Sequence, residues 1–276
     1  MGKKDFSDWL IVSDVDGTLN NKKRKTPLLN LSAIKRFVKE SGGNFTLASA
    51  RGAESLGPHY RKLPGVKTPA IVLNGAGIYD YEKEKMIWFN PVPSCAVEIV
   101  NEAMRRFPLL EIGVFTEDMI YLVRPRILSV VMMKLDNLTH KKCSSYNDVP
   151  SADAGKIIFF CLPWQKKKIK AFVTSRSDDS LACVDTTSMS FDMLNATTNK
   201  GNAIKVLAEI LGVPMKNTCG IGDYYNDVDM FKAVGHAACC GNSPDELEEL
   251  CEYRTCHCND GAVADFIGYI EKNYGN

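Results

Sequence analysis

Residues 10–20 read LIVSDVDGTLN, and this stretch decides the fold. Its apolar run ends at two aspartates, Asp14 and Asp16, and the turn-forming pair Gly17-Thr18 follows. A short apolar run that is bounded by turn residues is typical of a buried strand. Two carboxylates at the end of such a strand would be costly to bury without partners. The pattern therefore indicates a site that also holds positive charge.

Further short apolar runs end in Gly, Asp, Ser or Asn, and segments with helical spacing lie between the runs. This alternation predicts an α/β fold, in which a parallel sheet carries helices on its faces. Ligands bind at the carboxyl ends of the strands in such sheets, so the polar residues that end the runs are candidates for one site. The runs are 9–14, 44–49, 70–75 and 217–223, and the clearest helical segments are 28–42 and 201–213.

The middle of the chain follows a different pattern and predicts an inserted α+β domain over residues 89–187. The core domain would then be discontinuous, formed by residues 1–88 and 188–276. A chain of 276 residues exceeds the usual domain size of roughly 100 to 200 residues, which favours a core with an insertion. Within the insertion we expect a helix at 94–107, a hairpin at 109–125 that turns at Thr116-Glu117-Asp118, a strand at 156–163, a basic helix at 165–176 and a strand near 181–194.

The charge balance argues against nucleic acid or an acidic membrane as the main partner. The chain has 34 basic and 33 acidic residues, a formal charge of +1, whereas such partners select for a basic excess. No stretch approaches the ~20 apolar residues of a membrane span, and the N-terminus lacks a signal-peptide core. We therefore expect a cytoplasmic protein whose ten cysteines are reduced thiols.

Two segments of the sequence allow other interpretations. Cys251, Cys256, His257 and Cys258 form a C-x4-C-H-C cluster that invites a zinc site. Adjacent ligands make a tetrahedral cage awkward and no second spaced pair accompanies them, so small thiols near a surface turn are favoured. The D-x-D-G-T segment could also be a hairpin turn or begin a calcium loop, but the residues after it do not continue an EF-hand.

Four motifs follow one another along the chain: Asp14-Val-Asp16-Gly-Thr; Ser49-Ala-Arg51; Lys200 in TTNKGNAI; and Gly222-Asp223-Tyr-Tyr-Asn226-Asp227. In these motifs the sequence resembles the haloacid dehalogenase superfamily, and within it the Cof-like phosphatases with a large α/β cap (type IIB). The resemblance covers nearly the whole chain and implies a Rossmann-like core with an inserted cap domain. Two subsidiary stretches also look like that group: Leu73-Asn74-Gly75-Ala76, and Gly241-Asn242-Ser243-Pro244 with the later Asn259-Asp260-Gly261.

The resemblance implies a catalytic set of four residues. Asp14 would be the nucleophile that forms an aspartyl-phosphate, and Asp16 would protonate the leaving alcohol and then activate water. Ser49 would hydrogen-bond a phosphoryl oxygen, and Lys200 would neutralise charge on the phosphate and on the nucleophile. Where many members carry Thr-Gly-Arg, this chain has Ser49-Ala-Arg51, which keeps the hydroxyl but adds a side chain at the middle position.

The resemblance also implies a Mg²⁺ site and a set of substrate contacts. The ion would be held by an Asp14 oxygen, the Asp16 carbonyl and Asp223, with Asp227 binding directly or through water. Substrate contacts are expected from Gly17, which permits close approach of the main chain to phosphate, and from Ser49, Arg51, Asn74, Gly75, Lys200 and Asn226. Arg51 could instead contact a structural carboxylate, and Asn226 would orient the phosphate or Lys200.

The implied activity is that of a Mg²⁺-dependent phosphatase that hydrolyses small phosphomonoesters, such as sugar phosphates, pyridoxal phosphate or flavin mononucleotide. A cap that roofs the site favours a small soluble substrate. A sugar phosphomutase uses the same core residues, and a non-catalytic metabolite-binding regulator could keep the fold, so both remain alternatives. The turn at 116–118 with Phe115 and Tyr121 could set specificity, and the basic run Lys22–Lys25 could attract an anionic substrate. The physiological substrate and the oligomeric state stay open.

Overall fold

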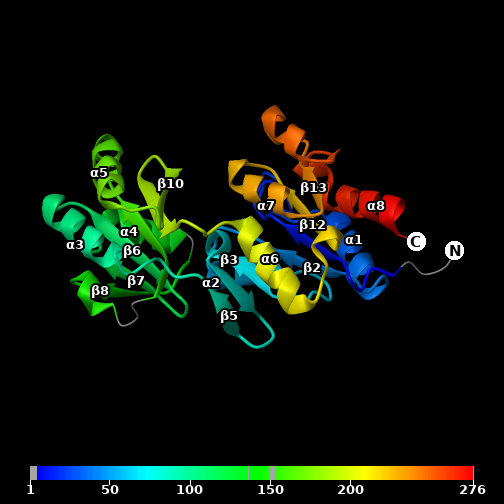
Figure 1. Cartoon of the computed structure of the whole chain (residues 1–276), viewed down its shortest axis with the longest axis horizontal. Coiled ribbons are helices and arrows are strands. Elements are labelled where there is room, and N and C mark those ends of the chain that lie inside the picture. The colour runs from blue at the N-terminus through cyan, green and yellow to red at the C-terminus, as the bar shows by residue number, and fades with distance from the viewer. Residues whose placement is uncertain (1–4, 136, 150–152, 276) are drawn as a thin grey trace. The chain divides into compact units, whose positions relative to one another are not determined.

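The computed structural model describes residues 5–135, 137–149 and 153–275, and the chain divides into two compact units (Figure 1). The first, which we call the core unit, comprises Met1–Ile87 and Asn199–Asn276, and the second, the insertion unit, is Trp88–Thr198. The core unit contains a parallel sheet, and the insertion unit has a sheet of its own. The predicted α/β class with an additional α+β domain is confirmed.

A five-stranded parallel sheet forms the centre of the core unit. Its order is β14-β13-β12-β1-β2, so β1 lies between two parallel neighbours, and all four of its residues are buried. A strand that is covered on both faces needs an uninterrupted apolar run, which LIVS supplies. The strands are β1 (Leu10–Ser13), β2 (Asn44–Leu47), β12 (Thr218–Gly222), β13 (His236–Cys239) and β14 (Tyr253–Arg254).

Helices connect and cover these strands. Two pairs of helices pack closely, α1 with α8 and α6 with α7 (Figure 1), and each of these helices has buried apolar residues. Helix α6 ends at Gly212, whose positive φ of 68° suits a left-handed C-cap. The helices of this unit are α1 (Leu28–Lys39), α2 (Ala53–Tyr60), α6 (Lys200–Leu211), α7 (Val228–Ala233) and α8 (Ala262–Tyr274).

The third apolar run, residues 70–75, was expected to add a strand to the core sheet, but its strand pairs mainly in another sheet. Its strand β3 (Ala70–Val72) touches the core sheet through a single parallel bridge between Ala48 and Ile71. Leu73 and Asn74 have positive φ angles of 53° and 61°, and the tight turn they form sends the chain back at once. Strand β3 therefore joins a separate sheet in the order β3-β4-β5, with β4 (Gly77–Asp80) and β5 (Lys85–Phe89).

The insertion unit is a six-stranded mixed sheet in the order β10-β11-β9-β6-β7-β8. Helices α3 and α5 cover one of its faces, and residues such as Ile99, Phe159 and Val173 form the apolar core between them. The strands are β6 (Glu111–Thr116), β7 (Ile120–Val123), β8 (His140–Cys143), β9 (Ala154–Phe160), β10 (Leu181–Thr187) and β11 (Ser190–Asn195). The helices are α3 (Ala96–Arg106), α4 (Ile127–Leu135) and α5 (Pro163–Arg176).

The end of the insertion unit lies beyond the expected boundary at residue 187. The segment that was expected to be one strand near 181–194 is a hairpin, in which β10 and β11 pair antiparallel. Strand β11 then pairs with β9 in the middle of the sheet. Because β11 belongs to this sheet, the unit continues to Thr198, and the core unit resumes directly before α6.

Candidate active site

Three strand ends bring the first candidate residues together at one edge of the core sheet. Asp14 follows β1 directly, Asp223 follows β12 directly, and Ser49 lies two residues beyond β2. The strands are parallel and in register, with Ser13 opposite both Leu47 and Ile221, so their carboxyl ends coincide. Polar side chains from distant parts of the sequence thus share this edge.

Lys200 completes the cluster from the start of α6. Its ammonium donates to Asp14 Oδ1 at 2.5 Å and to Asp227 Oδ1 at 2.6 Å, and its side chain is fully buried. Asn199 caps the helix, because its side chain accepts from the Asn202 main-chain N–H at 2.8 Å. The cap fixes the first helical residue, Lys200, so the ammonium is held at the strand edge.

The cluster carries more negative than positive charge. Burial raises the pKa of the Asp14 carboxyl from 3.8 to about 8, although Lys200 opposes the shift, and burial raises the pKa of Asp223 to about 6. Burial alone would lower the pKa of Lys200, but Asp14 and Asp227 outweigh it and the pKa is raised. Lys200 therefore stays an ammonium, and this one cation faces three carboxyl groups.

The donor set fits a hard divalent cation. Asp14, Asp223 and Asp227 each offer an oxygen, and these oxygens lie within 4.8 Å of one another. Mg²⁺ is bound through one or two carboxylates in such sites, and its charge would offset the excess that Lys200 leaves. Among the described residues this is the cluster whose composition and geometry suit a metal ion.

Asp227 has more contacts than a metal ligand alone requires. Its Oδ2 accepts from the main-chain N–H groups of Asp223 at 3.0 Å and Tyr224 at 3.2 Å, while Oδ1 receives Lys200. The expected helix does not start directly after β12, because a 3₁₀ turn (Tyr225–Asp227) precedes α7. Asp227 therefore fixes both the loop that carries Asp223 and the ammonium of Lys200. Asn226, which was expected to orient the phosphate or Lys200, is exposed, and its contact to phosphate stays a prediction.

Asp16 lies in a different environment from Asp14. Its side chain is 48% exposed, and its Oδ2 accepts from Arg51 Nε at 3.0 Å and Nη2 at 2.9 Å. Arg51 is held in turn by a bond from Nη1 to the Ser55 hydroxyl at 3.1 Å. Arg51 thus contacts a carboxylate, that of Asp16, and its contact to substrate stays a prediction.

Two polar contacts to Asp223 were missed at the sequence level. Thr18 Oγ1 donates to Asp223 Oδ1 at 3.2 Å, and Asn242 Nδ2 donates to Asp223 Oδ2 at 3.2 Å and to the Gly17 carbonyl at 2.9 Å. Gly17 has a φ of 88°, and a Cβ there would lie 2.2 Å from Asp223 Oδ2. Gly17 thus leaves room for Asp223. The stretch Gly241–Pro244 was a usable signal for Asn242, although no role had been attached to it.

The turns that follow β2 and β3 lie side by side and contain Ser49, Asn74 and Gly75. Ser49 is buried, its hydroxyl accepts from the Arg51 N–H at 3.3 Å, and its carbonyl accepts from the Asn74 N–H at 2.9 Å. A Cβ on Gly75 would lie 2.2 Å from the Asn199 carbonyl, so this glycine lets the start of α6 pack closely. Asn74 Oδ1 is buried without a hydrogen-bond partner among the described residues. Substrate contacts from these three residues stay predictions.

The predicted cysteine cluster has an ordinary local structure. Cys251, Cys256 and Cys258 carry free thiols. His257 Nδ1 accepts from the Asn259 main-chain N–H at 3.0 Å, so it closes a turn. Cys258 lines the pocket at the mouth of the candidate site, which has a volume of about 570 Å³ and also includes Asp16, Gly17, Arg51 and Asp223.

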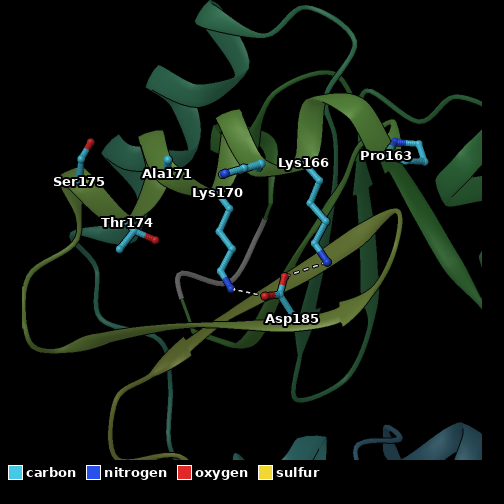
Figure 2. Close-up of a pocket in the computed structure, with 8 residues that line it drawn as sticks. Pro163, Lys166, Lys170, Ala171, Thr174, Ser175 and Asp185 are labelled. Carbon is cyan, nitrogen blue, oxygen red and sulfur yellow. Dashed lines mark hydrogen bonds and ion pairs between the residues drawn. The ribbon is translucent and has the colours of Figure 1, made fainter.

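A second pocket of about 730 Å³ lies in the insertion unit between α5 and β10 (Figure 2). Lys166 and Lys170, one helical turn apart, both bind Asp185, at 2.8 and 2.6 Å. Lys166 also donates to the Thr187 carbonyl at 2.5 Å. Both lysines are therefore paired with one carboxylate, which balances one of their two charges.

The core unit is thus an α/β fold whose parallel sheet carries a cluster of carboxylates and one buried lysine at the carboxyl ends of its strands. The chain belongs to the haloacid dehalogenase-like hydrolases, since the model of that family matches residues 11–267. The resemblance that the four motifs predicted is thereby confirmed. In the described part of the chain, no helix combines the length and apolar character needed to cross a membrane.

Individual relatives can be aligned with this chain over nearly its full length. The chain is 26% identical to a 5-amino-6-(5-phospho-D-ribitylamino)uracil phosphatase of Bacillus subtilis, over 94% of this chain and 97% of the relative. It is 21% identical to a pyridoxal phosphate phosphatase of Escherichia coli, over 94% and 97%. A solved haloacid dehalogenase-like hydrolase from Bacteroides thetaiotaomicron has the same fold, with a TM-score of 0.84 at 21% identity, covering 95% of this chain and 99% of that one.

Replacing Lys200 by methionine should destabilise the protein strongly. The buried carboxylates Asp14 and Asp227 would lose their cation, and such a loss costs about 3–5 kcal/mol. Lys170→Met is the matched control, because its partner Asp185 is exposed and such pairs contribute about 1 kcal/mol or less. Urea unfolding of both variants at pH 7 in EDTA measures the difference. Equal losses would contradict the assigned role of Lys200.

Asp223→Asn should stabilise the metal-free protein in a pH-dependent way. The folded-state pKa of Asp223 is raised to about 6 from 3.8, so ionising this group costs stability as the pH rises through about 4 to 6. In EDTA, the melting temperature of the variant should match wild type near pH 4 and exceed it by about 2–4 °C at pH 8. Added Mg²⁺ should raise the melting temperature of wild type much more than that of the variant. A difference that is independent of pH would contradict this account.

Proposed function

We propose that this hydrolase is a Mg²⁺-dependent phosphatase that cleaves small phosphomonoesters through an aspartyl-phosphate on Asp14. The main support for this proposal is the buried Lys200 ammonium, which binds both Asp14 and Asp227. Asp223 lies beside them at the carboxyl ends of the parallel strands. This arrangement combines a carboxylate nucleophile with fixed positive charge, the two features that phosphoryl transfer requires. Relatives named as phosphatases support the same activity.

In the first step an Asp14 oxygen attacks phosphorus and the bond from phosphorus to the ester oxygen breaks. Lys200 holds Asp14 in place and offsets negative charge on the phosphoryl oxygens. Asp16 gives its proton to the departing alcohol. The products of this step are the free alcohol, an acyl phosphate on Asp14 and an ionised Asp16.

In the second step the ionised Asp16 takes a proton from water, which attacks phosphorus and releases inorganic phosphate. Asp14 regains its carboxylate and Asp16 its proton, so the cycle closes. The half-exposed position of Asp16 suits this role, since the group must exchange protons with both the leaving alcohol and water. Arg51, bonded to Asp16 Oδ2, keeps the carboxyl group oriented at the pocket mouth.

Asp14, Asp223 and the Asp16 carbonyl would hold the ion, and Asp227 would support it by fixing the Asp223 loop. Bound Mg²⁺ supplies positive charge that the transferring phosphoryl group needs. Thr18 and Asn242 hold both oxygens of Asp223 and so present this carboxylate in one orientation. The Asp223 position is therefore preorganised by the chain itself.

The substrate class that we propose is a small phosphorylated metabolite, with the insertion unit acting as a cap. Two relatives are named for the phosphates of a pyridoxal and of a ribitylaminouracil, both small soluble esters. A solved sugar phosphatase of subclass IIB shares the fold, with a TM-score of 0.75. These names support a small ester and do not distinguish among sugars, cofactors and their precursors.

The test of the proposal is phosphate release and its dependence on the leaving group. Wild type should release phosphate from p-nitrophenyl phosphate and glycerol 3-phosphate with Mg²⁺, and EDTA should stop both reactions. Asp16→Asn should lower kcat/KM about 10²- to 10⁴-fold for glycerol 3-phosphate but much less for p-nitrophenyl phosphate, because nitrophenolate leaves without a proton and kcat/KM does not include the later attack of water. Asp229→Asn, an exposed carboxylate on α7, is the matched control. Equal losses on both esters would remove Asp16 from the role of general acid.

A further inference from the structure

The loop after Asp16 carries four consecutive basic residues, Lys22–Lys25, and these residues differ in whether they line the pocket of the candidate site. Of these, Lys22 and Arg24 line the pocket that also contains Asp16, Arg51 and Asp223. All four residues are exposed, and Lys23 and Lys25 are not among the described residues that line the pocket. The alternate members Lys22 and Arg24 therefore adjoin the candidate site.

The loop is a fixed turn. Asn21 Oδ1 accepts from the main-chain N–H groups of Lys23 and Lys25, both at 3.0 Å, and Arg24 N–H donates to the Asn21 carbonyl at 2.8 Å. Arg24 has a φ of 57°, in the left-handed region that costs a non-glycine residue about 1 kcal/mol. The Lys22 N–H donates to Asn259 Oδ1 at 3.1 Å, which ties the loop to a distant segment. Asn21 and Asn259 thus hold Lys22 and Arg24 at the pocket.

The charges of these two side chains are not balanced by carboxylates of the chain. Within the part of the chain that the structure describes, neither Lys22 nor Arg24 forms an ion pair. The other cations of the site are engaged, Lys200 by Asp14 and Asp227 and Arg51 by Asp16. The insertion-unit pocket is different, because two of its lysines are paired with Asp185 (Figure 2).

The Lys22 ammonium also acts electrostatically on Cys258, another residue of the pocket. Burial raises the pKa of the Cys258 thiol, and the nearby Lys22 ammonium opposes that shift. Cys258 and Lys22 both line the pocket. A bound anion in this pocket would therefore meet the charge of Lys22.

We propose that Lys22 and Arg24 form a subsite for a second anionic group on the alcohol part of the substrate, either a carboxylate or another phosphate. The inference rests on the proposed function, because the scissile phosphate must occupy the Asp14 site. An anion beside two unpaired cations in a partly enclosed pocket forms charge-assisted hydrogen bonds, which are stronger than neutral ones. The subsite narrows the substrate class from phosphomonoesters in general to those that carry an additional negative charge.

The test compares esters that differ in one anionic group. Three pairs cover different distances from the scissile phosphate: glycerol 3-phosphate and 3-phosphoglycerate; glucose 6-phosphate and 6-phosphogluconate; and fructose 6-phosphate and fructose 1,6-bisphosphate. Wild type should favour the more anionic member of at least one pair by about tenfold in kcat/KM, mainly through KM. Lys22→Ala and Arg24→Ala should each bring that ratio towards one. Lys23→Ala, from the same loop, should keep the wild-type ratio.

The outcomes separate the subsite from the proposed function. Equal kcat/KM within all three pairs would overturn the subsite while the phosphatase stands. A ratio that stays at its wild-type value in Lys22→Ala and Arg24→Ala, or that falls as much in Lys23→Ala, would also overturn it. If no ester releases phosphate, p-nitrophenyl phosphate included, the proposed function fails and the subsite fails with it.

Discussion

The rest of the site depends on one buried ammonium, that of Lys200, shared between Asp14 and Asp227. Asp14 ends a strand that is buried on both faces, and an unpaired carboxylate there would cost several kcal/mol. The start of α6 brings the ammonium to this place through close main-chain packing. A Cβ on Gly75 would lie 2.2 Å from the Asn199 carbonyl, and one on Gly201 would lie 2.1 Å from the Asp229 carbonyl.

The two aspartates of the opening motif differ because their surroundings differ. Asp14 is buried against a fixed cation, whereas Asp16 lies at the pocket mouth with about half of its side chain exposed. A buried carboxylate that is held by one ammonium is positioned for attack, and an exposed one can exchange protons. Arg51, which is paired with Asp16, lines the same pocket as Lys22 and Arg24, so three basic side chains surround the half-exposed carboxylate.

The sequence was sufficient to predict the fold class and the members of the cluster. Parallel strands place their carboxyl ends at one edge, so Asp14 and Asp223 had to meet once their runs were recognised as strands. Other features depend on contacts that no local pattern encodes. Asn242 reaches Asp223 across the sheet edge, and the turn at Leu73 and Asn74, which have positive φ, lets the third apolar run pair with β4. Likewise, the spacing of Asp227 fitted a metal ligand, and only its hydrogen bonds reveal that it also anchors Lys200.

The most direct test of the account is to trap the covalent intermediate. Wild type is mixed with Mg²⁺ and a phosphomonoester, quenched during turnover, and treated with borohydride, which reduces an aspartyl-phosphate to homoserine. Mass spectrometry of the peptide that contains residues 10–20 then locates the change, with Asp14→Asn as the blank. The account predicts homoserine at position 14 in wild type and none in the blank. Reduction at another residue, or steady turnover with no reduced residue, would contradict it.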